Sequence, residues 1–328
     1  MTVIVFIAEM AIFSIAAPGF LNFVNWLSMT ENFTFLGVMA LSQTFVIMAG
    51  GIDLSVGSTM SLSGVMMGVL WQHGINIWIA AIFGILIGGG AGWVNGQLVV
   101  RTGIQPSIIT LATLFIYGSL ATVLDGQGSI YGFPQSFVNV GTGDVFGVVP
   151  VQLIIFGAVA LVFAFVLKRT TYGRLVMFVG YNEEVAHYSG VSTGRVKVWT
   201  YVVSGLNSGL AAVLLGSYFA SVRGDMGTNM ELSVITICLV GGVSIFGGSG
   251  TISGVVLGTL ILGMLAQGLN ELNMASSEQS IVTGVILILA VGLQQFNVYL
   301  SGRRKGASKR PGKGVLPPIS DGIGSTES

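Results

Sequence analysis

The sequence predicts an all-α integral membrane protein with about ten transmembrane helices in two weakly repeated halves. Charged residues make up 8% of its 328 residues and hydrophobic residues 52%, and the mean hydropathy is +0.86. A water-soluble domain carries about 25% charged residues. A surface built from this chain would be a continuous apolar patch, for which lipid is the natural solvent. The 49 glycines are also typical of membrane helices, whose backbones approach closely at small residues.

Ten stretches of the chain are long and apolar enough to be membrane spans. A hydrocarbon core about 30 Å thick requires roughly 20 apolar residues per helix. No basic flank precedes the first apolar run, so this run is not expected to be a signal peptide. The predicted spans are residues 2–18, 33–50, 55–72, 76–99, 106–124, 150–167, 198–219, 229–245, 252–270 and 279–298.

The distribution of basic residues agrees with this count. Arg101 follows the fourth span, the basic loop 168–197 follows the sixth, and the basic tail 301–328 follows the tenth. With a cytoplasmic N-terminus all three lie inside the cell, as the positive-inside rule requires, and only Arg223 is an exception. Basic clusters can also indicate a nucleic-acid surface. Beside membrane spans the topological interpretation is favoured, so both termini are expected in the cytoplasm and no nucleic-acid partner is expected.

The polar segments complete the predicted organisation. Residues 125–149 are rich in turn residues and are expected to form an external loop. Residues 1–300 are expected to form one transmembrane domain that includes the loop 168–197. Residues 301–328 are rich in Gly, Ser, Pro, Lys and Arg, a composition that predicts a disordered cytoplasmic tail.

A glycine-rich break holds one of the few charged residues. The stretch at 50–58 reads GGIDLSVGS and places Asp53 between paired glycines and Ser55. Asp53 or Ser55 could cap the helix that starts near residue 55, where backbone N–H groups find no partner in lipid. Asp53 could also line a path for a polar solute, since ionisable residues in membrane segments are functional candidates. Capping is favoured, and the two interpretations are compatible.

A second stretch of the chain is weakly similar in sequence to residues 50–58. Residues 241–249 read GGVSIFGGS, which is similar to the first stretch. Many transporters are built from repeats whose broken segments flank the transport path. This similarity between the two stretches is the reason for expecting two weakly repeated halves.

The basic loop 168–197 contains a predicted short helix. Asn182 is a good N-cap, and Glu183 and Glu184 lie in the first turn, where the helix dipole favours negative charge. Gly190 can adopt the positive φ of a C-terminal cap. A helix of about two turns is marginal in water and needs a surface to lie against. That surface is either the lipid headgroups or, as favoured, a cytoplasmic partner.

Other polar side chains carry weaker signals. Amide residues within spans form interhelical hydrogen bonds, which explains most of them. The candidates for a translocation path are Gln43, Asp53, Ser55, Asn95 and Asn207.

No motif predicts catalysis or a metal site. The chain lacks an H-E-x-x-H motif, a Cys/His cluster and a G-x-S-x-G elbow with a partner histidine. It also lacks G-x-x-x-x-G-K-[ST], so no phosphate-cradling loop is present. The single Cys238 is expected to be a small buried side chain. No enzyme activity, metal or cofactor is therefore expected of this chain.

Three motifs together resemble a known family. GGIDLSVGS, TYGRLVMFVGYNEEVAHYSG and GGVSIFGGSGTISGVVLGTLILGML follow the order found in the monosaccharide branch of bacterial ABC importer permeases, within the branched-chain amino acid/ribose permease family. The resemblance covers residues 30 to 298. Two segments, LIIFGAVALVFAFVLKRTTYGR and LLGSYFASVRGDMG, look closest to autoinducer-2 and rhamnose permeases.

The resemblance implies an importer in the bacterial inner membrane. Two permease subunits, identical or different, would work with a cytoplasmic ABC ATPase that binds ATP and Mg²⁺, and with a periplasmic or lipid-anchored sugar-binding protein. Residues 168–197 would be the cytoplasmic coupling loop of the permease domain. The residues expected to couple to the ATPase are Gly173, Arg174, Gly180, Asn182, Glu183 and Gly190.

The sequence therefore predicts a permease subunit of an ATP-driven importer of a monosaccharide or sugar-like solute, working by alternating access. A stand-alone channel or secondary transporter for a small polar solute is the alternative. A membrane enzyme is disfavoured because no catalytic constellation is present.

Overall fold

The computed structural model describes residues 2–16, 22–126, 128–275 and 277–292. The predicted tail 301–328 and the end of the last predicted span lie outside the described residues. Residues 1–291 form one compact unit, and the description below concerns this unit.

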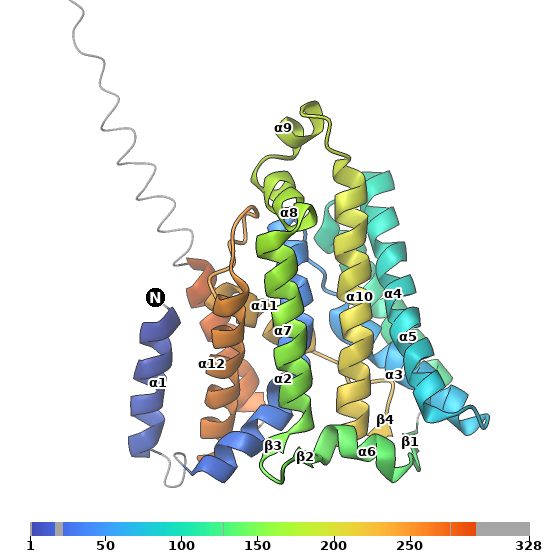
Figure 1. Cartoon of the computed structure of the whole chain (residues 1–328), viewed down its shortest axis with the longest axis vertical. Helices are drawn as coiled ribbons and strands as arrows, with labels where there is room; N and C mark the ends of the chain where they lie inside the picture. Colours follow the sequence, from blue (N-terminus) through green and yellow to red (C-terminus); the bar gives the residue numbers. More distant parts are fainter. Residues whose placement is uncertain (1, 17–21, 127, 276, 293–328) are drawn as a thin grey trace, which may run out of the picture. The chain divides into compact units, whose positions relative to one another are not determined.

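The unit is built mainly of helices (Figure 1). The described helices are α1 (Thr2–Ala16), α2 (Phe23–Met48), α3 (Val56–Gln72), α4 (Ile77–Thr102), α5 (Pro106–Leu124), α6 (Gln135–Thr142), α7 (Val151–Arg169), α8 (Thr171–Tyr181), α9 (Glu183–Tyr188), α10 (Thr193–Tyr218), α11 (Met230–Val240) and α12 (Ile252–Glu271), followed by an apolar helix at Ser277–Gly292.

Each of the ten predicted spans coincides with a helix. Five described helices, α4, α5, α7, α10 and α12, are long and apolar enough to cross a membrane. The other helices are shorter or less apolar, so the total of ten stays a prediction. Three boundaries differ clearly from expectation, and one of them is the start of α10, which lies at Thr193 ahead of the predicted residue 198. α2 begins at Phe23, ahead of the predicted residue 33, and α11 ends at Val240, ahead of residue 245, because Gly242 adopts a φ of +85° there.

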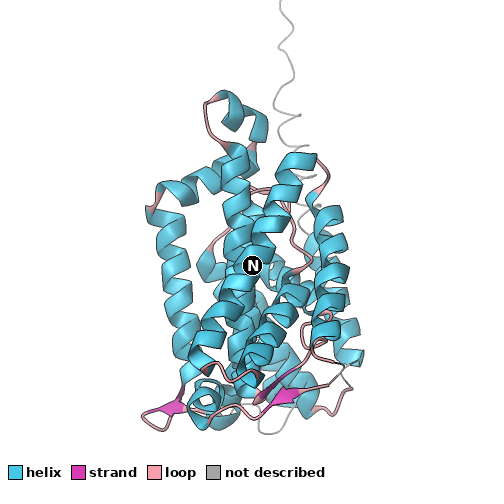
Figure 2. Cartoon of the chain, turned by 90° about the vertical axis from the view of Figure 1, so that its right-hand side faces the viewer, coloured by secondary structure: helices cyan, strands magenta, loops and turns pink. Residues whose placement is uncertain are grey.

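The expected external loop 125–149 is more ordered than a loop. It holds α6 and three two-residue strands, β1 (Ile130–Tyr131), β2 (Asp144–Val145) and β3 (Val149–Pro150). β1 pairs antiparallel with β4 (Ser221–Val222), and β2 pairs with β3. The strands lie at the end of the unit opposite α9 (Figure 2). Strands this short carry no alternating pattern that a sequence could reveal.

Among the described helices, α4 packs most extensively against α10, and glycine makes this packing possible. α4 carries glycine at every fourth position from Gly84 to Gly96, which places these residues on one face. A Cβ at Gly88 would overlap the carbonyl oxygen of Gly205, and a Cβ at Gly92 would overlap that of Tyr201. In lipid, where apolar side chains gain nothing by pairing, such close backbone packing is a main source of helix association.

The second half of α2 forms the centre of the unit. Residues 34–48 of α2 are buried throughout. This segment packs against α7, α10, α11 and α12. Hydroxyl side chains of this segment donate hydrogen bonds to backbone carbonyls of the same helix. Thr44, for example, donates to the carbonyl of Ala40 over 2.8 Å.

Substitution of Gly92 tests whether the close backbone contact between α4 and α10 stabilises the protein. We expect Gly92→Ala to lower the melting temperature of the detergent-solubilised protein, because overpacking costs about 1–3 kcal/mol. Gly90→Ala is the matched control, since no atom lies within 4 Å of a Cβ at Gly90 on the same helix. It should leave the melting temperature unchanged or slightly raised, because alanine favours the helix. Equal effects of the two substitutions would contradict this account of the crossing.

Candidate functional site

A buried polar cluster surrounds Asp53, which is 2% exposed. Its Oδ1 accepts hydrogen bonds from the backbone N–H of Ser55 over 2.9 Å and from the Ser55 hydroxyl over 2.7 Å. Its Oδ2 accepts a hydrogen bond from the hydroxyl of Ser204, on α10, over 3.0 Å. Three donors from two parts of the chain therefore satisfy a carboxylate whose burial would otherwise be very costly.

The cluster continues from Ser55 into two further helices. Asn95, on α4, donates to the Ser55 hydroxyl over 2.7 Å. Tyr117, on α5, donates to the Asn95 carbonyl oxygen over 3.2 Å and to the backbone carbonyl of Ala91 over 3.1 Å. We call Asp53, Ser55, Asn95, Tyr117 and Ser204 the Asp53 cluster. It joins the start of α3 to α4, α5 and α10.

The glycines before Asp53 turn the chain into this position. Gly50 has a φ of +82° and donates to the carbonyl of Ile47, and Gly51 donates to the carbonyl of Val46. This is the bonding pattern of a helix that ends on a left-handed glycine. Gly51 also lies against the hydroxyl of Tyr201, where a Cβ would come within 2.6 Å. The turn leads the chain from the end of α2 into the interior.

The expected capping role of Asp53 and Ser55 is wrong. Ser55 occupies the N-cap position of α3, but no side chain bonds to the first helical N–H groups. The Asp53 carboxylate accepts from the N–H of Ser55, which is the N-cap residue and precedes the first helical residue, Val56, so this bond does not cap the helix. The Ser55 hydroxyl points to Asp53 and Asn95 and is used there.

The structure brings three of the five translocation-path candidates together. Asp53, Ser55 and Asn95 belong to the Asp53 cluster. Asn207 lies on α10 and donates to the carbonyl of Val203 over 2.9 Å. Gln43 is fully buried in α2, and its side-chain amide has no hydrogen-bond partner among the described residues.

Tyr117 and Ser204 belong to the cluster but were not expected from the sequence. Both are buried within apolar spans that contain other hydroxyl residues. No spacing in the sequence distinguishes them, because their partners lie on other helices.

The loop 168–197 forms two helices instead of the one expected. The predicted helix is α9, and its predicted caps are confirmed. Asn182 accepts from the N–H of Val185 over 2.9 Å, and Gly190 has a φ of +82° and donates to the carbonyl of His187 over 2.9 Å. Glu183 lies in the first turn and forms an ion pair with Lys197. The additional helix is α8, which begins after Thr170, whose side chain accepts from the N–H of Gly173.

α8 is fixed to the membrane-facing part of the unit by packing. Val176 and Val179 are almost fully buried. Tyr172 stacks on Phe45 of α2, with ring centroids 6.3 Å apart, and donates to the carbonyl of Val196 on α10. Arg174 stays exposed and donates to the hydroxyl of Thr171 over 3.2 Å.

Two of the predicted coupling glycines mark close backbone contacts. A Cβ at Gly180 would overlap the carbonyl oxygen of Met48, the last residue of α2, and would approach the N–H of Gly248. That N–H donates to the same Met48 oxygen over 2.9 Å. Gly173 lies against the carbonyls of Val166 and Leu167 at the corner between α7 and α8. The end of α8 thus contacts the end of α2 and the loop between α11 and α12.

Residues 50–58 and 241–249, which are similar in sequence, begin with the same type of turn but then take different paths. Gly242 donates to the carbonyl of Leu239 and Val243 to that of Cys238, the same pattern as at Gly50 and Gly51. The first stretch continues into the Asp53 cluster, whereas the second continues to the contact with α8. The resemblance between the stretches is thus visible in the backbone of these turns, and a repeat of whole halves stays a prediction.

Large side chains are exposed at the end of the unit formed by α8 and α9. Tyr181 and Tyr188 are each 84% exposed, and Val185 is half exposed. We call these three residues the α9 face. An exposed apolar group next to charged residues is typical of a protein interaction site.

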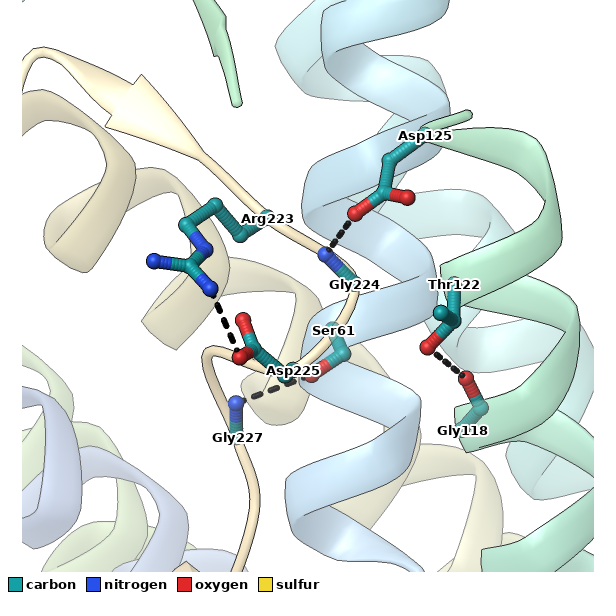
Figure 3. A network of polar contacts seen from close by, with 8 residues as sticks. All are labelled: Ser61, Gly118, Thr122, Asp125, Arg223, Gly224, Asp225 and Gly227. Atoms are coloured by element: carbon teal, nitrogen blue, oxygen red, sulfur yellow. Dashed lines mark hydrogen bonds and ion pairs between the residues drawn. The ribbon is translucent and has the colours of Figure 1, made fainter. Parts of the chain in front are cut away.

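The opposite end of the unit holds a second polar network (Figure 3). The Asp125 carboxylate accepts from the N–H of Gly224, and the Ser61 hydroxyl accepts from the N–H of Gly227 over 2.9 Å. Arg223 and Asp225 form an exposed ion pair at 2.9 Å. These bonds hold segment 223–227 against α3 and α5. A cavity of 510 Å³ opens beside it, lined in part by Phe35, Tyr218, Phe219, Arg223 and Asp225.

Among the described residues, no three His, Cys, Asp or Glu side chains come together as a possible metal site.

Comparison with known proteins gives a consistent result over most of the chain. The family model for the branched-chain amino acid transport system / permease component matches residues 25–291. Autoinducer 2 import system permease protein LsrD from Yersinia enterocolitica is 37% identical over 291 residues, which cover 87% of this chain and 88% of that protein. Proteins of the same name from Yersinia pseudotuberculosis and Yersinia pestis are 36% and 35% identical, with 87% of each chain covered. No solved structure matches.

Substitution of Asp53 tests whether its buried hydrogen bonds stabilise the protein. Asp53→Ala removes the acceptor for Ser55 and Ser204, and we expect it to lower the stability by about 1–3 kcal/mol for each charged hydrogen bond lost. Asp53→Asn keeps one acceptor and should cost less. The melting temperature in detergent measures both. Asp144→Ala, at an exposed carboxylate, is the control and should have no effect; an Asp53→Ala protein as stable as this control would refute the structural role of the cluster.

Proposed function

This chain belongs to the branched-chain amino acid transport system / permease component family, and from that premise we propose that it is the permease subunit of an ATP-driven, binding-protein-dependent importer of a monosaccharide or sugar-like solute. The observation that carries this proposal is the match over 87% of the chain to autoinducer 2 import permeases. The solute belongs to the class of ribose, rhamnose, xylose and autoinducer-2, and autoinducer-2 is the first candidate because the relatives carry that name.

The subunit works with partners. A cytoplasmic ABC ATPase binds ATP and Mg²⁺, a second permease subunit of the same or a different kind completes the channel, and a periplasmic or lipid-anchored protein delivers the solute. The family and the names of the relatives support an importer in general, while the composition of the complex is our proposal.

The subunit is a multi-pass protein of the bacterial inner membrane, with both termini in the cytoplasm. The basic loop 168–197 and the basic tail lie on the cytoplasmic side under the positive-inside rule. α9 then projects into the cytoplasm, and the strands and segment 223–227 face outward.

Coupling starts at the α9 face and reaches the membrane through α8. The ATPase binds Tyr181, Val185 and Tyr188, which are exposed and have apolar surface to bury. Movement of α9 carries α8 with it. The contact of Gly180 with Met48 and Gly248 transmits the movement to α2 and to the α11–α12 loop. Rocking of these helices against the second permease exposes the path to each side in turn.

The path candidates have different environments in the conformation described. Asp53, Ser55 and Asn95 bond to one another and to their neighbours, which supports a role in holding the helices. Contact with solute would require the Asp53 cluster to open. Gln43 and Asn207 lie outside this cluster and complete the proposed set.

One observation favours the alternative of a stand-alone carrier. Glu9 of α1 is buried, and its carboxyl has no hydrogen-bond partner among the described residues. A buried carboxyl of this kind is what an ion-coupled transporter would use.

Reconstitution distinguishes the two functions. We expect the purified chain alone in liposomes to give no flux of labelled autoinducer-2 or monosaccharide, and the full complex to give uptake that requires ATP hydrolysis and the binding protein. Flux through the chain alone, without nucleotide, would refute the importer proposal and support the carrier.

A second test addresses the α9 face. Tyr188→Ala and Val185→Asp remove exposed apolar surface, so we expect ATPase binding to weaken at least tenfold, as measured by copurification from membranes. The melting temperature of the permease should not change, because neither side chain is buried. Tyr131→Ala is the control: this tyrosine is 76% exposed at the opposite end and should not affect ATPase binding. Unchanged binding by both α9 variants would exclude this face as the docking site.

A further inference from the structure

A cavity of 760 Å³ lies between α4 and α10, next to α9, and neither the transport path nor the ATPase contact described above includes it. We call it the α4–α10 cavity. It begins at the last turns of α4 and the first turns of α10 and extends to Gly89 and Gly90 on α4 and Val202 on α10. The basic side of the protein is therefore at its mouth, and the membrane-spanning part of both helices forms its walls.

The hollow results from the same glycines that allow the helices to meet. Gly88 and Gly92 bring the two backbones into contact. Gly89 and Gly90 line the cavity and have no side chains to fill it. Val202 adds an aliphatic side chain at this end of the cavity, and Val100 and Val198 add aliphatic surface nearer the mouth. This deep part of the cavity is suited to a hydrocarbon chain.

The mouth of the cavity carries positive charge that nothing in the described chain neutralises. Arg195 is exposed and forms no ion pair or hydrogen bond with any described residue. The nearby Lys197, by contrast, is already paired with Glu183. His187, Ser192 and Thr193 add donors at the same level, and no described residue lining the cavity is acidic. An arginine in this setting is suited to a phosphate, which its planar fork can bind through two hydrogen bonds.

Two tryptophans lie between the charged mouth and the deep end of the cavity formed by Gly89, Gly90 and Val202. Trp199 lies one turn after Arg195 on the same face of α10, and Trp93 lies one turn before Gln97 on α4. Both tryptophans are about half exposed, at 58% and 51%. Tryptophan is enriched at the depth of the lipid headgroups, where its ring bridges polar and apolar surroundings. From the mouth inward, the order of Arg195, Trp199 and Val202 on α10 matches the order of phosphate, ester and acyl chain in a phospholipid.

We propose that the α4–α10 cavity binds an anionic phospholipid of the inner leaflet, with the lipid phosphate at Arg195. Basic pockets between membrane helices on the cytoplasmic side are known to hold anionic headgroups. The site is separate from the solute path and depends only on the cytoplasmic placement of the mouth. Because His187 of α9 also lines the cavity, a bound lipid would contact the helix proposed to couple to the ATPase.

Thermal unfolding of the delipidated full chain in nonionic detergent tests this site. Phosphatidylglycerol should raise the melting temperature in a saturable way, while phosphatidylcholine with the same acyl chains and inorganic phosphate should not. We expect Arg195→Gln to weaken the apparent affinity for phosphatidylglycerol about fivefold, the loss expected for one basic residue at an anionic membrane surface. Arg169→Gln, an exposed arginine outside the cavity, should bind as the unmodified chain does.

Native mass spectrometry of the chain in mixed lipids is a second test, and it needs no variant. We expect the chain to retain phosphatidylglycerol in preference to phosphatidylcholine. Equal retention of the two lipids, or an unchanged titration for Arg195→Gln, would overturn the proposal. A shift reproduced by inorganic phosphate would assign the mouth to a soluble anion instead. A dimer of the delipidated chain that Arg195→Gln dissociates would assign this face to contact between copies. These measurements use the chain alone, so they are independent of the transport assay.

Discussion

The close contact between α4 and α10 is the interaction on which the rest of the structure depends. Two membrane helices gain little by pairing large apolar side chains, so they need another source of attraction. Here the glycines on α4 and Gly205 on α10 let the backbones touch. That contact places Asn95 of α4 within hydrogen-bond distance of Ser55 and Ser204 of α10 within hydrogen-bond distance of Asp53. A wider crossing would leave the Asp53 carboxylate without Ser204 and Ser55 without Asn95.

The turn between α2 and α3 connects the interior to α8. Met48, at its start, accepts the hydrogen bond from Gly248 and lies against Gly180 of α8. Asp53, five residues later, is bonded to α10. A displacement of α8 would therefore act on the end of α2 and, through the turn, on the cluster that joins α3, α4, α5 and α10. A buried, fully bonded cluster resists gradual distortion, which favours movement of these helices together.

The two ends of the unit use their polar residues differently. At the end that holds the strands, Asp125 and Ser61 hold segment 223–227 through backbone N–H groups, so rigidity there does not depend on charge pairs. At the opposite end, α9 has few buried side chains, and Tyr181 of α8 and Tyr188 of α9 are exposed. A short helix with so little buried surface is stabilised by its caps and by whatever binds it. This difference fits the proposal that the end with the strands is held in place while the end with α9 binds a partner.

The sequence by itself determined the features that depend on neighbouring residues. Hydropathy located a helix at every predicted span, and capping chemistry located α9 from Asn182 to Gly190, because an N-cap bond and a left-handed glycine are local. The same reasoning missed α8 and the two-residue strands, and it assigned Asp53 and Ser55 to a cap that does not form. Only the tertiary structure decided those contacts: Asp53 and Ser204 are 151 positions apart in the chain, and Gly180 meets Met48 and Gly248 only after three helices have packed. Such contacts depend on how closely whole helices approach one another, and no periodicity within a single segment records that distance.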